Sequence, residues 1–271
     1  MRVCAHSGSA DTASFISFPL NILKSRIFHT GRMLIVERRL FEGASMSEES
    51  RARARAETRK LVRESIGRGD EYKWNQELYS RAGRRAEGIP WAEMVPNPNL
   101  VSWTGKKGIS GNGKRALVIG CGLGDDAEEL QRRGFSVTAF DIAQTAIDWC
   151  KERFPDSQVR YMVADLFYPP SEWRGGFDFV LESYTLQTFP VPLRLRAMKA
   201  IAELVASQGK LLVIARGRNA NEPEGDFPWP LLNDELKFFQ ETGLREVSFE
   251  DYCDNEDPPI RRFRVEYKRV E

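Results

Sequence analysis

Hydrophobic runs and amphipathic stretches alternate through the middle of the chain, between residues 116 and 215. Short runs rich in Val, Ile, Leu and Phe are typical of buried strands, and longer stretches with apolar positions at helical spacing are typical of helices. The predicted strands are residues 116–119, 136–140, 159–163, 177–181 and 210–215, and the predicted helices are residues 125–133, 143–154 and 193–206. This alternation predicts a parallel sheet with helices on both faces.

The pattern changes on both sides of this segment. After it, Asn233 begins a predicted helix that Gly243 ends, and two more strands are expected near residues 246–251 and 262–268. Before it, a polar helix is expected over residues 51–65, with its basic run facing solvent, followed by an aromatic amphipathic stretch and proline-rich breaks. The expected domains are therefore a helical cap and lead-in over residues 46–113 and an α/β domain over residues 114–271.

Residues 1–45 follow neither pattern. Ser and Thr are frequent there, acids are rare and the basic residues are spread out. This composition is typical of a disordered leader rather than a folded unit. Two interpretations stay open: an organellar transit segment, or an extension upstream of a true start at Met46, which we favour.

Composition and charge narrow the choice of partners. A chain of 271 residues that is 41% hydrophobic is long enough for one α/β domain with an extension. The 40 basic and 39 acidic residues nearly balance, which argues against a nucleic-acid or membrane-surface protein. The four cysteines form no C-x-x-C pair, which argues against a disulfide framework and against a bound metal. We expect a cytoplasmic monomer with a small-molecule partner, or an organellar protein if residues 1–45 are a transit segment.

Three alternate glycines, Gly120, Gly122 and Gly124, stand where the first predicted strand gives way to a helix. Glycine lets a ligand approach the backbone, and the free amides at a helix start bind carboxylates or phosphates. Asp141 ends the second strand, where a carboxylate can accept hydrogen bonds from both ribose hydroxyls of an adenosine cofactor. A second acid, Asp165, follows the third strand. Each acid could instead be a turn or helix cap, and a glycine loop by itself also occurs in turns without a ligand.

Taken together, the run from Val118 to Asp125 and the two acids resemble the pattern of class I S-adenosylmethionine-dependent methyltransferases over about residues 114–216. The resemblance implies a Rossmann-like fold whose seven-stranded, mostly parallel sheet has the order 3-2-1-4-5-7-6 with the last strand antiparallel. It implies that the glycines line the methionine moiety of S-adenosylmethionine, that Asp141 holds the ribose and that Asp165 meets the adenine. The other residues assigned to the cofactor are Cys121, Ile142, Leu166, Phe167 and Glu182.

The methyl acceptor is expected beyond the carboxyl ends of the strands, near the loop after the fourth strand. If the acceptor is an amine or a phenol, Glu182 or Tyr184 would help to remove its proton, whereas a soft, ionised acceptor needs no base. Glu182 is equally suited to touch the amino group of the cofactor or to form a structural salt bridge. Arg216 would bind an anionic or electron-rich acceptor, or be a rim charge. The aromatic candidates for the acceptor pocket are Trp91, Trp103 and Trp229.

A looser resemblance concerns the tryptophans and prolines ahead of the glycine loop. Trp74, Trp91, Pro96 and Pro98 are arranged as in the thiopurine methyltransferase superfamily, which implies a small, soft acceptor such as a thiol. The predicted function is methyl transfer from S-adenosylmethionine to a small molecule. Two rivals stay open, a nicotinamide-dependent oxidoreductase and a protein that binds S-adenosylmethionine without catalysis. The spacing of the glycines and Asp165 argue against the first, and only a turnover assay excludes the second.

Overall fold

A computed structural model describes residues 48–270 of the chain. The predictions for residues 1–45 therefore lie outside the described residues. Within residues 48–270, no helix combines the length and the apolar character that crossing a bilayer requires. The same residues contain no group of three or more His, Cys, Asp and Glu side chains placed to hold a metal ion.

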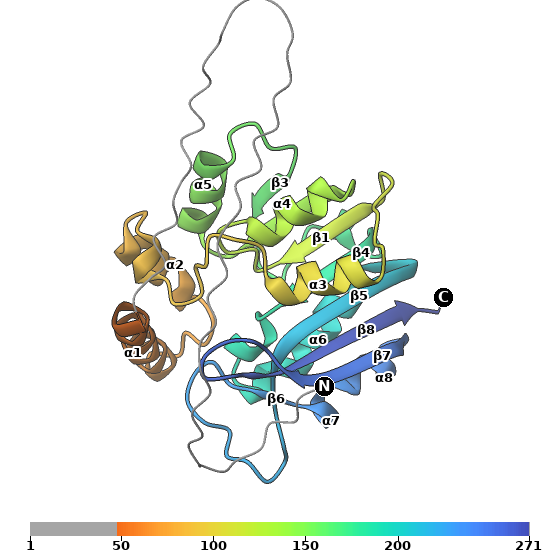
Figure 1. The fold of residues 1–271 in the computed structure, drawn as a ribbon. Coiled ribbons are helices and arrows are strands. Elements are labelled where there is room, and N and C mark those ends of the chain that lie inside the picture. The colour runs from red at the N-terminus through yellow and green to blue at the C-terminus, as the bar shows by residue number, and fades with distance from the viewer. Residues whose placement is uncertain (1–47, 271) are drawn as a thin grey trace, which may run out of the picture. The chain divides into compact units, whose positions relative to one another are not determined.

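A mixed sheet organises this part of the chain (Figure 1). Its order is β3-β2-β1-β4-β5-β8-β7, with β6 paired to β5 beside this path. Strand β8 is antiparallel to both neighbours, and the other pairings of the main path are parallel. Without the two-residue β6 this is the predicted order 3-2-1-4-5-7-6, so the predicted topology is confirmed. The strands are β1 (Arg115–Ile119), β2 (Ser136–Asp141), β3 (Arg160–Val163), β4 (Phe177–Ser183), β5 (Val205–Arg218), β6 (Leu231–Leu232), β7 (Leu244–Cys253) and β8 (Arg261–Arg269).

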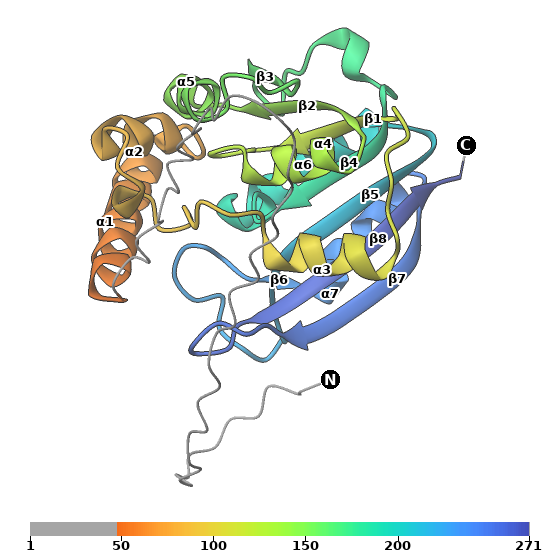
Figure 2. The ribbon, with the colours of Figure 1, turned by 45° about the horizontal axis from the view of Figure 1, so that its top comes forward.

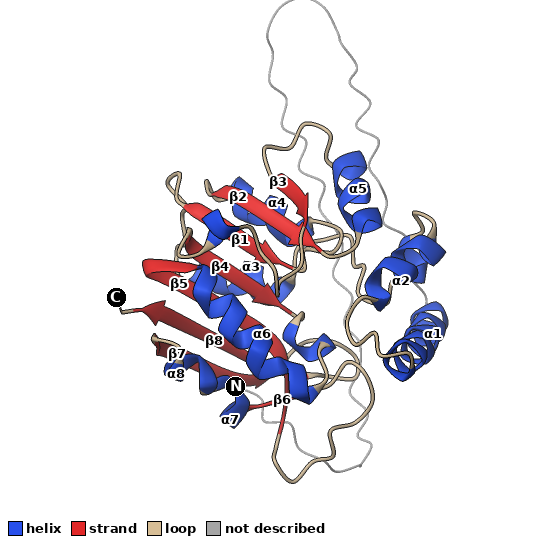
Figure 3. Cartoon of the chain, turned by 180° about the vertical axis from the view of Figure 1, so that it is seen from behind, coloured by secondary structure: helices blue, strands red, loops and turns tan. Residues whose placement is uncertain are grey.

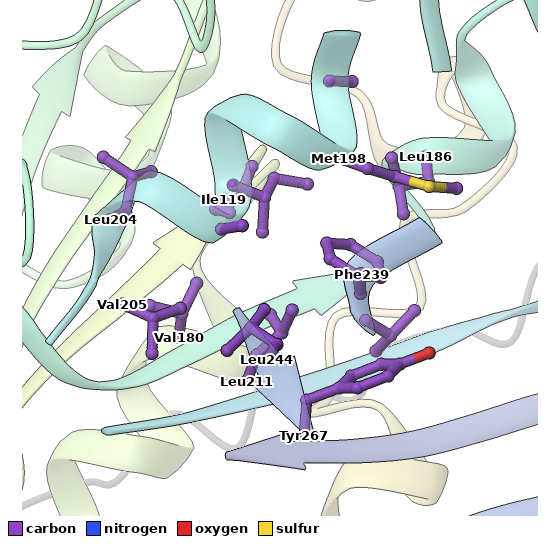
Figure 4. Packing of buried hydrophobic residues seen from close by; sticks show 14 of the residues in the cluster. Ile119, Val180, Leu186, Met198, Leu204, Val205, Leu211, Phe239, Leu244 and Tyr267 are labelled. Atoms are coloured by element: carbon purple, nitrogen blue, oxygen red, sulfur yellow. The ribbon is translucent and has the colours of Figure 1, made fainter. Parts of the chain in front are cut away.

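Helices cover both faces of the sheet, as the alternation of elements predicts (Figures 2 and 3). One face carries α3 (Pro98–Lys106), α4 (Asp125–Arg132) and α5 (Gln144–Arg153), whose apolar side chains form one buried cluster with β1, β2 and β4. The opposite face carries α6 (Val191–Leu204), α7 (Asn233–Leu236) and α8 (Phe238–Glu241). Figure 4 shows the second cluster, in which Met198 and Phe239 pack between these helices and the strands. Burial of both clusters supplies the main driving force for folding.

The cap consists of α1 (Glu48–Gly67), α2 (Trp74–Ala82) and the 3-10 turn η1 (Ala86–Gly88). Two further 3-10 turns, η2 (Ser171–Trp173) and η3 (Leu186–Thr188), lie in the loops around β4. A third buried cluster joins the cap to α5 and to Phe227, whose ring meets that of Trp74 edge-on at 4.9 Å between centroids. This packing fixes the cap against the α/β part of the chain.

Several element boundaries differ from the prediction. The proline-rich break at residues 96–98 is the beginning of α3, because Pro98 suits the first helical turn and the Asn97 side chain accepts a hydrogen bond from the Asn99 amide. The helix expected over residues 233–242 is split into α7 and α8. The carbonyl of Leu236, which a continuous helix would use internally, accepts a hydrogen bond from the Tyr267 hydroxyl at 2.9 Å.

Two cysteines are free thiols, Cys121 and Cys150. Cys253 is disulfide-bonded, a pairing that the argument against a disulfide framework did not anticipate. The absence of a C-x-x-C motif excludes only a short local loop, because a disulfide can join residues that are remote in the sequence.

Candidate functional site

A cavity of about 850 Å³ opens at the carboxyl ends of the parallel strands. Its wall includes the last residues of β1 and β2, Ile119 and Asp141, together with Ser183 at the end of β4 and Arg216 near the end of β5. The order of the strands reverses at this point, because β2 and β3 lie on one side of β1 whereas β4 and β5 lie on the other. Open α/β sheets bind their ligands at such a switch point.

The glycine loop after β1 forms the floor of the cavity. Gly120, Gly122 and Gly124 have φ angles of 58°, 54° and 91°, a region that other residues adopt only with strain. At Gly122 the surroundings are also tight, because an added Cβ atom would lie 3.2 Å from the Tyr79 hydroxyl oxygen. The backbone of this loop therefore reaches the cavity in a shape that depends on glycine.

Asp141 is buried and fixes the glycine loop to the end of β2. Its Oδ2 accepts a hydrogen bond from the Gly122 amide at 3.1 Å, and its Oδ1 accepts one from the Ala143 amide at 2.9 Å. Burial raises the pKa of Asp141 to about 6, although both amide bonds act in the opposite direction. At neutral pH this carboxylate is ionised, with lone pairs left over for a ligand.

Asp165 is tied to the cap. Its Oδ1 accepts a hydrogen bond from the Phe167 amide at 2.9 Å, and its Oδ2 accepts one from the Tyr72 hydroxyl at 3.1 Å. Burial, and then the charge of Asp165, raise the pKa of Tyr72 to about 12, so that the phenol stays a donor. Both residues line the cavity. Sequence reasoning missed Tyr72, whose only signal is its place in an amphipathic aromatic stretch.

The predicted cofactor residues divide into two groups. Gly124, Phe167 and Glu182 are not part of the cavity wall; the ring of Phe167 packs on those of Tyr72 and Phe189 instead. The predicted residues that do line the cavity are Gly120, Cys121, Gly122, Asp141, Ile142, Asp165 and Leu166.

Glu182 lies beneath the loop that follows β4. Its Oε1 accepts hydrogen bonds from the amides of Thr185 at 2.7 Å and Leu186 at 2.8 Å. Its Oε2 is buried and has no hydrogen-bond partner among residues 48–270. Burial raises the pKa of Glu182 to about 7. The structure thus places Glu182 as a support for the loop and does not bring it into the cavity, because β4 points this side chain at the backbone of the turn.

Tyr184, in contrast, lines the cavity. Its φ of 64° is unusual for a residue with a side chain and is one of the strained conformations that gather at functional sites. The Tyr184 hydroxyl accepts a hydrogen bond from Asn99 Nδ2 at 2.9 Å, and the Arg262 guanidinium lies 4.5 Å from the ring centre. Burial raises the pKa of Tyr184, which keeps its phenol protonated at neutral pH.

Asp126, in the first turn of α4, is a carboxyl group of the cavity wall that sequence reasoning missed. Its Oδ1 accepts a hydrogen bond from the Asn97 amide at 2.7 Å, and burial raises its pKa to about 6. The neighbouring Asp125 forms an ion pair with Arg153 at 2.7 Å. The sequence signal was the acidic pair itself; both acids line the cavity, but only the fold shows that Asp125 is the one paired with Arg153.

The three predicted tryptophans have different surroundings. Trp91 lines the cavity, and its Nε1 donates a hydrogen bond to the Tyr79 hydroxyl at 3.1 Å. Trp103 is 1% exposed and stacks on Phe179 in the core, so its assignment to the acceptor pocket does not fit the structure. Its position on α3 turns it toward the sheet. Trp229 also lies outside the cavity wall, which is formed here by the adjacent Phe227 and Pro228.

Comparison with known proteins finds similarity in the segment that contains the glycine loop at the floor of the cavity. Residues 116–209 match the family model described as "Methyltransferase domain". A magnesium-protoporphyrin O-methyltransferase of Rhodobacter capsulatus is 36% identical over 83 residues, which are 30% of this chain and 36% of that protein. A ubiquinone biosynthesis O-methyltransferase of Aeromonas salmonicida is 30% identical over 127 residues, 45% of this chain and 52% of the relative. The matches thus span about half or less of these relatives.

One solved structure resembles more of the chain than residues 116–209 alone. The 1,6-didemethyltoxoflavin-N1-methyltransferase of Burkholderia thailandensis, solved with bound 1,6-didemethyltoxoflavin and S-adenosylhomocysteine, aligns with a TM-score of 0.54. The alignment covers 81% of this chain and 90% of that structure at 15% identity. Likeness at this identity shows a shared fold, in which the helices and strands outside residues 116–209 take part.

Proposed function

We propose that the protein transfers the methyl group of S-adenosylmethionine to a small-molecule acceptor. One observation carries this proposal: a glycine loop with positive φ angles and the buried carboxylate of Asp141 meet in a single cavity at the switch point of the sheet. The match of residues 116–209 to a methyltransferase domain supports it, as do the relatives named as O-methyltransferases and the neighbour solved with S-adenosylhomocysteine.

In this proposal the cofactor lies along the ends of β1, β2 and β3. The loop at Gly122 lies against its methionine part, and Asp141 accepts hydrogen bonds from the ribose hydroxyls. Each carboxylate oxygen of Asp141 has a second lone pair besides the one that accepts a backbone amide, so both contacts can coexist. Asp165, oriented by Tyr72, meets the adenine amino group, and Leu166 packs near the ring.

Methyl transfer from a sulfonium is an in-line displacement that depends mainly on alignment of the acceptor. Tyr184 and Trp91 line the cavity and are the groups proposed to position that acceptor. Glu182, outside the cavity, positions the loop that carries Tyr184. For an amine or phenol acceptor, Asp126 is the better candidate base, since it lines the cavity and has a pKa of about 6. A thiol acceptor, and with it the likeness to the thiopurine methyltransferase superfamily, stays a prediction.

The test has two stages. Calorimetry with S-adenosylhomocysteine measures whether the cavity binds the proposed cofactor product. Incubation with methyl-labelled S-adenosylmethionine and a panel of thiols, phenols, amines and carboxylic acids then identifies the acceptor from the labelled product. Absence of S-adenosylhomocysteine binding would refute the proposal, whereas binding without turnover on any acceptor would favour a non-catalytic binding protein.

A further inference from the structure

We propose that Arg55 and Arg216 form a binding subsite for an anionic group, a carboxylate or a phosphate, of the methyl acceptor. This inference rests on the proposed methyl transfer. The two residues are far apart in the sequence, on α1 and β5, and both line the same cavity.

The guanidinium of Arg216 lacks an acid partner in the part of the chain that the structure describes. Its backbone amide donates a hydrogen bond to Gln187 Oε1 at 2.8 Å, but its guanidinium makes no hydrogen bond or ion pair within residues 48–270. The Nε atom is buried without a hydrogen-bond acceptor. A buried donor that lacks an acceptor lowers stability unless a ligand or water binds it. Natural structures contain few such groups, and they concentrate at functional sites.

Arg55 approaches the same cavity from the cap. It lies one helical turn from Arg51 and from Arg59, so the three side chains share one face of α1. Arg51 lies 3.4 Å from Glu93 Oε1, and Arg59 Nε donates a hydrogen bond to the Phe227 carbonyl at 3.0 Å. Arg55 has no such partner among the described residues. The basic run was expected to face solvent, but its half-buried Arg55 faces the cavity instead.

Two other arginines of this wall are neutralised by acids. Arg262 pairs with Asp254 at 2.6 Å and with Glu256, and Arg264 pairs with Glu250 at 2.6 Å. A third, Arg59, donates a hydrogen bond to the Phe227 carbonyl, so among the arginines of the wall that lie within residues 48–270 only Arg55 and Arg216 have guanidinium groups without a hydrogen bond or ion pair. Burial lowers the pKa of Arg216, and the nearby charges of Arg262 and Arg55 lower it further, partly offset by Glu256. Two like charges in one partly buried cavity repel each other, and an anion between them relieves that repulsion.

The position of Arg55 and Arg216 indicates that the anionic group they bind belongs to the acceptor and not to the cofactor. Arg216 is on β5, which is separated from the glycine loop of β1 by the whole of β4. Adjacent strands are about 4.8 Å apart, so Arg216 begins about 10 Å from the loop proposed for the methionine part. Arg55 lies on α1 near the loop after β5, as the bond from Arg59 to Phe227 indicates. Guanidinium groups bind carboxylates and phosphates through paired hydrogen bonds.

The subsite is tested by calorimetry on the full chain with three probes: benzoate, phenyl phosphate and the uncharged benzamide. Each is titrated with and without saturating S-adenosylhomocysteine. The variants are Arg55→Gln and Arg216→Gln, and the control is Arg53→Gln, an exposed arginine of the same helix. We expect at least one anion to bind more tightly than benzamide, and each variant to weaken that binding about 10- to 100-fold. The Arg53 variant should match the unaltered protein.

The affinity for S-adenosylhomocysteine separates the possible failures. It should stay within about twofold in both variants, since the proposed subsite binds the acceptor. A large loss would show that the guanidiniums hold the methionine carboxylate and would overturn the inference. Equal binding of both anions and benzamide, or unchanged anion binding in both variants, would overturn it as well. If the unaltered protein does not bind S-adenosylhomocysteine, the proposed function fails, while the titrations without it still decide the subsite.

Discussion

The two sides of the cavity differ in how they are built and in the charge they carry. The proposed cofactor side uses residues 118–166, which follow one another along β1, β2 and β3, and its charged groups are carboxylates. The proposed acceptor side joins α1, α3, β5 and the hairpin of β7 and β8, and its charged groups are a mixture of basic residues, mostly arginines, and acids. Hydrogen bonds across it connect Arg59 to Phe227 and Arg264 to Asn99, residues 168 and 165 positions apart.

The cofactor side is therefore a local motif, whereas the acceptor side is assembled from elements that are distant in the sequence. The carboxylate of Asp141 is fixed by amides 2 and 19 residues away, so a short segment is enough to build it. The acceptor side exists only once the cap, the sheet and the loop after β5 have packed together. We therefore expect changes on the cofactor side to alter cofactor affinity directly, and changes beneath the acceptor side to alter stability first.

The largest expected effect is on stability, at Trp103. Trp103→Ala should lower the free energy of unfolding by about 3–5 kcal/mol, because this indole is buried against Phe179 and its removal leaves a cavity. Chemical denaturation measures the change. Trp91→Ala is the matched control, since Trp91 is 36% exposed and should cost about 1 kcal/mol or less. A larger loss at Trp91 than at Trp103 would place Trp103 with the acceptor side after all.

The next effect concerns the carboxylate of the cofactor side. Asp141→Asn should weaken S-adenosylhomocysteine binding by about 1–3 kcal/mol, because charge-assisted hydrogen bonds to the ribose are lost. Calorimetry measures it, with the exposed Asp156→Asn as a control of equal charge change. Unchanged affinity in a folded Asp141 variant would remove this residue from the cofactor site.

Acid should weaken cofactor binding in the same way. The pKa of Asp141 is about 6, so lowering the pH from 7 to 5 protonates most of it and should reduce S-adenosylhomocysteine affinity about tenfold. For folding the sign is opposite: the raised pKa means that ionisation of Asp141 lowers the stability of the free protein as the pH rises from about 4 to 6. Affinity measured between pH 5 and 8 tests the first statement. Asp141→Asn should lose this dependence, whereas Glu182→Gln should keep it.

The smallest predicted effect links the cap to the cofactor side. Tyr72→Phe removes the hydrogen bond to Asp165 Oδ2 and should weaken S-adenosylhomocysteine binding by about 0.5–1.5 kcal/mol. The exposed Tyr168→Phe is the control, and calorimetry again gives the affinity. A loss greater than that of Asp141→Asn, or none, would show that the cap does not act through Asp165.

Local patterns in the sequence were sufficient for the positions of the main strands, the glycine loop and the acid at the end of β2, whereas the order of the strands was implied by the resemblance to class I methyltransferases. The reason is that strand burial, helix periodicity and positive-φ turns each depend on a few neighbouring residues. The same reasoning failed at α3, where the prolines that indicate a break also suit the first turn of a helix. Proline restricts φ but does not decide which way the chain continues.

The tertiary structure alone decided which long side chains face the cavity. Glu182 and Tyr184 are two residues apart, yet one supports a backbone turn and the other lines the cavity. Trp91 and Trp103 look alike in the sequence, but only the packing of α3 on the sheet buries the second. Arg55 looks like a solvated helix residue in the sequence, and only the packing of α1 near the loop after β5 places it in the cavity wall. Each outcome depends on what packs opposite the side chain, and those partners are remote in the sequence.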